Sequence, residues 1–265
     1  MLKMDLEKLT SQVVVLAEEV AVFITQERQK FDLSQVEHKG KNDLVSYVDK
    51  ESERKLVRGL GQILSEATFL TEEKTVEQTE GELQWIIDPL DGTTNFVHGI
   101  PAYSISIALA KHDEMLLGVV YEVTRKECFS AWNGGGAFLN GNLIRVSPID
   151  ELSESLFGTG LPIQNFEKKA NYLKIIGELM ESSHGIRRIG SAALDLAYVA
   201  CGRCEGFFEC NLNSWDVAAG ALIVQEAGGV VTDFSGGENY LVGKEIVAAS
   251  TVHTELLGVI QKYWS

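Results

Sequence analysis

Several features that define common protein classes are missing from this sequence. It has no run of about 18 or more apolar residues, which argues against a membrane-spanning helix. The first residues, Met1 to Lys8, alternate charged and apolar side chains and lack the apolar core of a signal peptide. Internal repeats, low-complexity segments, an H-E-x-x-H metal motif and a dinucleotide-binding fingerprint are also absent. We therefore expect a globular, cytoplasmic protein with no membrane partner.

Basic residues are scarce as well. The chain has 23 Lys and Arg against 38 Asp and Glu, a formal net charge of −15. A nucleic-acid partner requires a basic face that neutralises phosphates, so this composition argues against DNA or RNA binding. The same charge opposes an anionic substrate, unless a bound cation reverses the sign of the potential at the site.

The four cysteines do not form a recognisable zinc or redox motif. Cys201 and Cys204 have the C-x-x-C spacing, but a zinc site needs a second pair of ligands and only Cys210 is near. We expect reduced cysteines that pack on or near a helix.

In the first half of the chain, the hydrophobic pattern predicts helices followed by an antiparallel meander. The helices are expected from Leu6 to about Arg28 and from Lys50 to Leu64, with a loop over Phe31 to Lys41 between them. The expected strands are Thr68–Leu70, Trp85–Ile87, Tyr103–Ala110, Met115–Val123 and Cys128–Trp132. We interpret Asn133–Gly136 as a hairpin loop rather than a phosphate cradle, since no helix follows it, and Asn140-Gly141 as a second hairpin turn.

The second half alternates strands and helices. Strands are expected at Leu156–Thr159, Glu205–Glu209, Val230–Asp233 and Ile246–Ala249, and helices at Asn165–Met180, after Gly190-Ser191, from Ser214 or Asp216, and up to Tyr263. The length of 265 residues suits one large domain or two smaller ones. We divide it into an N-terminal α+β half, residues 1–145, and a C-terminal α/β half, residues 146–265.

One stretch, Trp85 to Phe96, contains candidate metal ligands and candidate anion-binding groups. An apolar strand is expected to end at Pro89, which lacks an N–H for the ladder. Asp88 and Asp91 then offer oxygen ligands of the kind that Mg²⁺ prefers. Gly92 permits a left-handed backbone, and the N–H groups of Gly92 and Thr93 could meet a phosphate. A metal site beside an anion site suits phosphoryl chemistry, although Asp-x-x-Asp-Gly alone is also an ordinary surface turn.

Two strings in the right order resemble a known family. Asp88-Pro-Leu-Asp-Gly-Thr-Thr94 is similar to the first signature of the inositol monophosphatases, the Mg²⁺-dependent, lithium-sensitive sugar phosphatases, and Trp215-Asp-Val-Ala-Ala-Gly220 is similar to their second. The pair Glu72-Glu73 resembles the family's Gly-Glu-Glu, with Thr71 where glycine is usual. The resemblance spans the chain from the Asp43–Asp49 segment to Gly228-Gly229.

The resemblance implies a set of site residues. The metal ligands would be Glu72, Asp88, Asp91, Asp216 and the carbonyl oxygen of Leu90. The residues that orient and deprotonate the attacking water would be Glu72, Thr93 and Asp49. The substrate contacts would be Asp91, Gly92, Thr93, Gly190, Ser191, Ala192, Glu209 and Asp216.

Four of these residues also have purely structural interpretations. Asp49 could cap a helix, Asp216 could be the acidic residue that a helix N-terminus favours, Glu72 could lie on a solvated face, and Glu209 could be an exposed acid at a strand end. Ser191 follows a strand and begins a helix, but the G-x-S-x-G pattern is absent, which argues against a serine nucleophile.

The resemblance further implies the fold and the activity. It implies an α+β protein with layers α/β/α/β/α, a largely antiparallel N-terminal sheet, a mixed C-terminal sheet and a homodimer. The implied reaction is hydrolysis of a phosphate monoester with two or three Mg²⁺ ions, most simply of inositol monophosphate. Fructose 1,6-bisphosphate, a 3′,5′-bisphosphonucleotide and a non-catalytic regulatory role stay open as alternatives.

Overall fold

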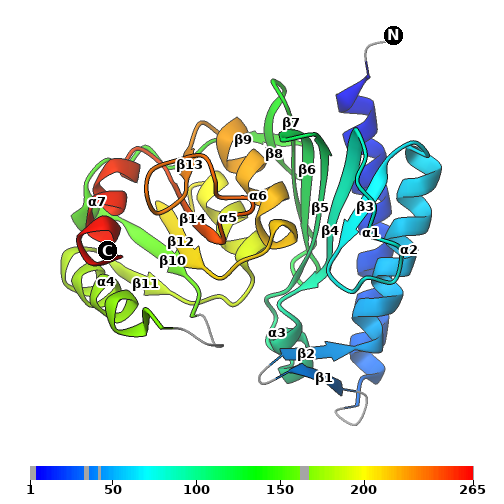
Figure 1. Ribbon diagram of the computed structural model, residues 1–265, viewed down its shortest axis with the longest axis horizontal. Helices are drawn as coiled ribbons and strands as arrows, with labels where there is room; N and C mark the ends of the chain where they lie inside the picture. The colour runs from blue at the N-terminus through cyan, green and yellow to red at the C-terminus, as the bar shows by residue number, and fades with distance from the viewer. Residues whose placement is uncertain (1–3, 33–35, 41–42, 162–166, 265) are drawn as a thin grey trace.

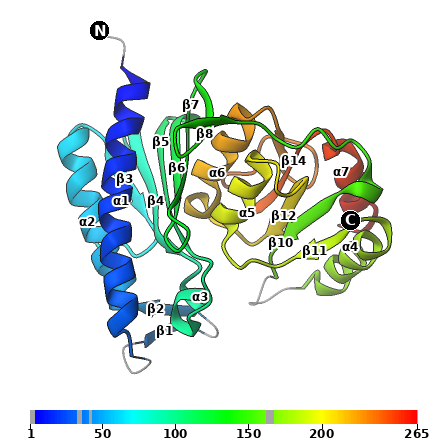
Figure 2. The same ribbon diagram turned by 180° about the vertical axis from the view of Figure 1, so that it is seen from behind.

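The computed structural model describes residues 4–32, 36–40, 43–161 and 167–264, with the backbone alone for 36–40 and 43–45. Its elements form five layers (Figures 1 and 2). Helices α1 (Leu6–Lys30) and α2 (Tyr47–Ile63) cover one face of a seven-stranded sheet. Helices α5 (Ala192–Ala200) and α6 (Ser214–Glu226) fill the space between that sheet and a five-stranded sheet. Helices α4 (Lys169–Ser182) and α7 (His253–Trp264) form the last layer, so the α/β/α/β/α prediction is confirmed.

The first sheet has the order β3-β4-β5-β6-β7-β8-β9 among the described residues. All neighbouring pairs are antiparallel except β3–β4, which is parallel, so the predicted antiparallel meander is confirmed. Side chains alternate between the two faces: Ile87 and Ile107 pack toward α1 and α2, whereas Ile86 and Ala108 pack toward α5 and α6. The strands are β3 Thr68–Thr71, β4 Leu83–Asp91, β5 Ser104–Lys111, β6 Glu114–Glu122, β7 Glu127–Trp132, β8 Gly136–Leu139 and β9 Asn142–Ile144.

The second sheet is mixed, as predicted. Its order in the described chain is β11-β10-β12-β14-β13, with β10 parallel to β11 and β12, and β14 antiparallel to β12 and β13. The strands are β10 Leu156–Thr159, β11 Gly185–Arg187, β12 Gly206–Cys210, β13 Val230–Thr232 and β14 Glu245–Ala249. The division of the chain at residue 145 stays a prediction.

Small residues let α6 lie very close to the first sheet. A Cβ atom on Gly118 of β6 would lie 2.7 Å from the carbonyl oxygen of Ala219, nearer than real Cβ atoms approach backbone. On the other side of α6, a Cβ atom on Gly220 would lie 2.6 Å from the Cβ of Leu196 in α5. These glycines bring both helices, and the residues at their N-termini, against the sheet.

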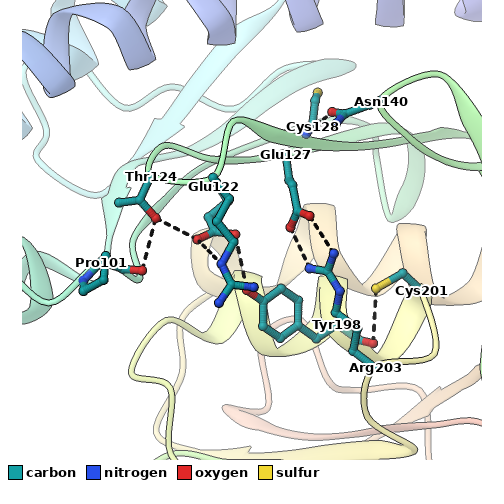
Figure 3. Close-up of polar contacts among 10 residues, drawn as sticks. Pro101, Glu122, Thr124, Glu127, Cys128, Asn140, Tyr198, Cys201 and Arg203 are labelled. Carbon is teal, nitrogen blue, oxygen red and sulfur yellow. Dashed lines mark hydrogen bonds and ion pairs between the residues drawn. The ribbon is translucent and has the colours of Figure 1, made fainter.

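The C-terminal end of α5 is fixed to the β6–β7 turn by polar contacts (Figure 3). The guanidinium of Arg203 donates to both carboxylate oxygens of Glu127, each over 2.6 Å, and its carbon lies 4.8 Å from the centre of the Tyr198 ring. The Tyr198 hydroxyl donates to buried Glu122 over 3.2 Å. Planar bidentate pairs and cation–π contacts of this kind fix orientation, so α5 is held at this end as well as at its N-terminus.

The predicted end of the central strand at Pro89 is wrong. Strand β4 continues to Asp91, and the ladder to β5 shifts between Asp88, which pairs with Ser106, and Asp91, which pairs with Ser104. Pro89 and Leu90 thus lie opposite a single residue of β5. A proline without an N–H is tolerated at such a bulge, where ladder hydrogen bonds are already interrupted.

Two expectations near α2 also need correction. The predicted loop from Phe31 to Lys41 contains strand β1 (Val36–Gly40), which pairs with β2 (Asp43–Ser46) in a separate antiparallel sheet; residues 33–35 and 41 lie outside the described residues. Helix α2 begins at Tyr47 rather than Lys50, because Ser46 is its N-cap. Asp49 is therefore the third residue of the helix and not the cap.

The glycine-rich hairpin loop after β7 binds a carboxylate side chain of the same protein. The N–H groups of Gly134 and Gly136 donate to the two oxygens of Glu226 at the end of α6, each over 2.8 Å. The predicted hairpin loop is confirmed, and its N–H groups hydrogen-bond to the last residue of α6.

Among the described residues, helix α1 is long enough and apolar enough to cross a membrane. Its buried side, which includes Val13, Ala17, Val20 and Ile24, packs on the first sheet. A core helix of this kind passes the same test, so the finding is weak evidence for a membrane. The four cysteines are free thiols.

Candidate active site

The bulge in β4 fixes the first two acidic residues of the site. Asp88 is 2% exposed, and its Oδ1 accepts a hydrogen bond from the N–H of Leu90 over 2.9 Å. Three residues later, Asp91 ends the strand on the opposite side of the bulge. The interrupted ladder thus turns both carboxyl groups toward the end of the sheet where α5 and α6 begin.

Asp91 is held by the N-terminus of α5. Its Oδ2 accepts from the Ser191 hydroxyl over 2.6 Å and from the N–H of Ala193 over 2.8 Å. Ser191 is also the N-cap of α5, accepting from the N–H of Leu194, and its hydroxyl lies 3.1 Å from that of Ser104. A carboxylate at a helix N-terminus is stabilised by the free N–H groups and by the helix dipole.

Asp216 is positioned in the same way by its own helix. It is the third residue of α6, and its Oδ2 accepts from the N–H of Asn213 over 2.6 Å in a capping box. The helix N-terminus is tied to the first sheet because the Ser106 hydroxyl donates to the carbonyl oxygen of Trp215 over 3.1 Å. The structural and the functional interpretations of Asp216 are therefore compatible.

Asp49 and Thr93 meet beside the bulge. Oδ2 of the fully buried Asp49 accepts from the N–H and hydroxyl of Ser46, over 2.9 and 2.6 Å. Its Oδ1 lies 2.9 Å from the Thr93 hydroxyl, which is also 3.1 Å from the carbonyl oxygen of Leu90. Asp49 thus serves as part of a capping box and as a hydrogen-bond acceptor at the site.

Glu72 follows β3 directly. Its N–H donates to the carbonyl oxygen of Ile87 over 3.2 Å, which continues the pairing with β4. The next turn is held by the buried carboxylate of Glu53 on α2, which accepts from the N–H of Glu73 over 2.7 Å and of Thr75 over 2.6 Å. Thr71, at the position where the resemblance predicts glycine, is accommodated as the last residue of β3.

The acidic residues perturb one another strongly. Burial raises the pKa of Asp88 well above its usual range, and the charges of Glu72, Asp91 and Asp216 raise it further. Burial and the charge of Asp91 likewise raise the pKa of Asp216. Burial raises the pKa of Asp91 to about 6, although hydrogen bonds from Ser191 and Ala193 lower it. The structure therefore brings together the four acidic side chains that the sequence predicted as one site.

The predicted substrate residues lie around this group. Gly92, with φ +97°, is the N-cap of the short helix α3 (Thr93–His98). A Cβ atom on Gly92 would lie 3.3 Å from the carbonyl oxygen of Gly190. The Asn95 amide joins the two segments by donating to the carbonyl oxygen of Ile189 over 2.9 Å. Glu209, on β12, is near enough to Asp91 for the two charges to interact; burial first, then that charge, raises its pKa to about 8.

A divalent cation fits these residues. The carboxylates of Glu72, Asp88, Asp91 and Asp216 and the carbonyl of Leu90 offer only oxygen donors, as Mg²⁺ prefers. Burial and then the charge of Glu72 raise the pKa of Asp88, which shows that the carboxyl groups of the set are poorly compensated by the protein alone. In the described part of the chain, no three acidic, His or Cys side chains stand close enough to hold an ion without moving. Metal binding would therefore turn these carboxylates toward the ion.

Several residues that build the site were not predicted from the sequence. They are Ser46, Glu53, Asn95, Ser104 and Asn213, which orient the predicted residues through the hydrogen bonds given above. Ser46 and Asn213 carry a local signal, because each stands three positions before an aspartate, the spacing of a capping box. Glu53 and Ser104 act across the fold and leave no such signal.

The chain is similar to known proteins over nearly its whole length. The model of the inositol monophosphatase family matches residues 5–265. Nus factor SuhB of Escherichia coli K12 is 44% identical over 220 residues, 83% of this chain and 82% of that protein. Inositol-1-monophosphatase of Mesorhizobium japonicum is 41% identical over 230 residues, 86% of each. A solved IMPase/NADP phosphatase complexed with Mg²⁺ and phosphate has a TM-score of 0.84 and 25% identity, covering 97% of this chain and 96% of that one.

The five layers and the buried group of carboxylates at the end of β4 define the class of protein, the α/β/α/β/α fold shared by a family of phosphatases. The chain belongs to the inositol monophosphatase family.

Proposed function

We propose that this protein is a Mg²⁺-dependent phosphatase that hydrolyses the phosphate monoester of a polyol, with inositol monophosphate as its substrate. The observation that carries the proposal is the convergence of Glu72, Asp88, Asp91 and Asp216 at one end of the first sheet, where their charges interact. Such a set is unfavourable without a cation and suits a cation that must meet an anionic substrate.

The metal ions would be held by the four carboxylates and by the carbonyl of Leu90. When bound, Mg²⁺ supplies charge neutralisation for the phosphoryl group and a lowered pKa for water at the site. The relative solved with Mg²⁺ and phosphate supports this assignment. Two or three ions would bind at each site, as the family resemblance implies.

The proton of the attacking water would pass toward the Thr93–Asp49 pair. The Thr93 hydroxyl lies 2.9 Å from Asp49 Oδ1, so it can accept from water on one side while donating to the carboxylate on the other. Burial raises the pKa of Asp49 although hydrogen bonds from Ser46 and Thr93 lower it, which makes this carboxylate a better proton acceptor than an exposed one. Glu72 completes the set that orients the water.

The phosphate and the polyol would bind on opposite sides of Asp91. The N–H groups of Gly92 and Thr93 face the phosphate, while Gly190, Ser191 and Ala192 line the other side. Glu209 accepts hydrogen bonds from the polyol hydroxyl groups. Its separation of seven residues from Asp216 matches the family's spacing and favours a polyol phosphate.

We further propose a cytoplasmic homodimer, as the family resemblance implies. The alternative substrates are fructose 1,6-bisphosphate and a 3′,5′-bisphosphonucleotide. A second candidate function, a non-catalytic regulatory role, is favoured by the relatives named Nus factor SuhB. The intact acidic set argues for catalysis.

The test is phosphate release by the purified protein with and without Mg²⁺ and Li⁺. The substrates are inositol 1-phosphate, fructose 1,6-bisphosphate and 3′-phosphoadenosine 5′-phosphate. Turnover of inositol 1-phosphate that requires Mg²⁺ and is inhibited by Li⁺ is the expected result. Absence of turnover on all three substrates, with Mg²⁺ binding demonstrated by calorimetry, would favour the regulatory role.

A further inference from the structure

A cavity with no role so far lies on the face of the first sheet that α1 covers. It has a volume of about 730 Å³, with α1 as one wall and side chains of β6, β7 and β8 as its floor. Cavities of this size hold small organic molecules. The candidate active-site residues are not part of its lining, so this cavity is separate from the acidic centre at the end of β4.

Aromatic side chains form much of the floor. Cys128, Ser130 and Trp132 alternate along β7 onto the α1 face of the sheet, and Phe138 of β8 joins them because it pairs with Ser130. The half-buried Trp132 and Phe138 rings are stacked, with their centres 5.1 Å apart and their planes at 9°. A Cβ atom on Gly135 would lie 2.0 Å from the indole ring, so glycine there lets the ring lie against the hairpin loop. The stacked pair is therefore a fixed apolar platform.

The wall that α1 contributes is acidic. Glu7 and Glu18 both line the cavity, and their separation of 11 residues, about three turns, puts them on the same side of the helix about 16 Å apart. The hydroxyls of Thr10 and Ser11, which lie between them, donate to carbonyl oxygens of α1 itself. Neither carboxylate forms an ion pair with any residue that the structure describes. Both are free to meet a cation.

The potential at the floor is negative as well. Burial, and then the charge of Glu18, raise the pKa of Cys128 to about 12, and the same two causes raise the pKa of Tyr121. Lys126 is the one basic residue among the described residues that line the cavity, against two carboxylates. The net charge of the chain, −15, has the same sign. A cation is therefore attracted into this cavity and an anion is repelled.

We propose that this cavity binds an organic cation, an amine whose apolar body lies on the Trp132–Phe138 platform while its ammonium group is held by Glu18. Aromatic rings attract cations through their faces in addition to packing against apolar groups. The site goes beyond the proposed phosphatase function and does not depend on it.

The spacing of platform and carboxylate sets the length of the ligand. Phe138 lies opposite Ser130, which is two residues, or about 7 Å, along β7 from Cys128. The charge of Glu18 acts at Cys128. A ring that carries its ammonium group on a short alkyl chain spans this separation.

The experiment uses three probes that share one apolar body, namely 4-phenylbutylamine, 4-phenylbutanol and 4-phenylbutyrate. Each is titrated into the wild-type protein by calorimetry at pH 7.5, with Mg²⁺ present so that the amine does not compete for the carboxylates of the candidate active site. We expect the amine to bind at least about tenfold more tightly than 4-phenylbutyrate, with the alcohol between them. Absence of saturable amine binding, or equal affinities for amine and carboxylate, would overturn the inference.

Two variants locate the site. Glu18→Gln should weaken amine binding about fivefold and leave the alcohol unchanged, because it removes a charge and no apolar surface. Phe138→Ala should weaken all three probes. Glu19→Gln is the matched control, since it makes the same change at the next, equally exposed position of α1, which does not line the cavity. Equal effects of Glu18→Gln and Glu19→Gln would overturn the inference, even if Phe138→Ala fails to fold.

A second copy of the chain is the competing occupant of this face. Leu143 of β9 pairs with Phe138 and is 61% exposed beside the platform. If sedimentation shows a dimer that Leu143→Glu dissociates, and the amine binds only to the dissociated protein, the face is an interface between copies and the inference is overturned. Amine binding that is the same in wild type and Leu143→Glu supports the proposed site.

Discussion

The Ser191 hydroxyl couples the acidic centre to α5, and its removal tests the architecture of the site. It donates to Asp91 over 2.6 Å and caps the helix by accepting from the N–H of Leu194. Above pH 7, Asp91 is ionised, because burial raises its pKa only to about 6. Ser191→Ala therefore removes a hydrogen bond to a charged group and a helix cap in one step.

The expected magnitude follows from those two losses. A hydrogen bond to a charged group contributes about 1.5–3 kcal/mol, and loss of an N-cap costs about 1 kcal/mol. Since one hydroxyl makes both interactions, we expect a loss of about 2–3 kcal/mol in the free energy of unfolding. For a chain of this size that lowers Tm by about 5–10 °C at pH 7.5. The affinity for Mg²⁺ should fall as well, because Asp91 is no longer oriented.

Ser235→Ala is the matched control. The Ser235 hydroxyl donates to Asp233 over 2.5 Å in a loop that contains none of the predicted site residues. This variant should lose stability and keep its Mg²⁺ affinity, as measured by thermal denaturation and by calorimetry. A Ser191→Ala protein with unchanged Tm and unchanged Mg²⁺ affinity would refute the reasoning.

Three further predictions concern the same centre. Asp91→Asn or Asp216→Asn should reduce Mg²⁺-dependent phosphate release at least about 100-fold with the fold retained, as circular dichroism checks; substantial turnover at saturating Mg²⁺ contradicts the ligand assignment. Glu53→Gln should weaken the turn after β3 and raise the Mg²⁺ concentration needed for half-maximal activity several-fold, whereas an unchanged requirement argues against a role for Glu53 in placing Glu72. Without metal, Tm should fall as the pH rises from about 5 to 8, because acids such as Asp88 and Asp91 have folded-state pKa values above those of the unfolded chain and must ionise in the fold. Saturating Mg²⁺ should reverse the trend; a Tm that rises over this range without metal would show that other groups dominate.

Most elements were predictable because their pattern is local. The meander of the first sheet follows from period-two alternation and from hairpin turns such as Asn140-Gly141, whose two residues have φ values of +48° and +78°. The end of β4 was mispredicted because proline is excluded from a regular ladder but not from a bulge, and a bulge depends on the partner strand. The start of α2 was misplaced because Ser46 and Asp49 both resemble caps, and only the geometry shows which one is the N-cap.

The acidic residues of the candidate site were proposed from sequence motifs, whereas the contacts that hold them in place were not predicted. The acids near β4 and α6 stand in strings specific enough to point to one family. Their orientation depends on partners about 100 residues away, such as Ser191 for Asp91, and no local pattern encodes such a pair. The close packing of Gly160 against Glu209 is equally hidden, because only the fold shows that a Cβ atom on Gly160 would overlap the Glu209 carboxyl group.

The central helix layer has a consequence for synthesis of the chain. The inner face of the first sheet, with Ile86, Ala108 and Phe129, is covered by α5 and α6, which are translated after all of its strands. About 90 residues separate the end of β7 from the end of α6, or about 5–20 s at common elongation rates. During that interval the emerging sheet exposes an apolar face, and Asp88 and Asp91 lack Asp216. The proposed activity would therefore require that synthesis has passed α6, and chains truncated before it should aggregate rather than accumulate as inactive monomers.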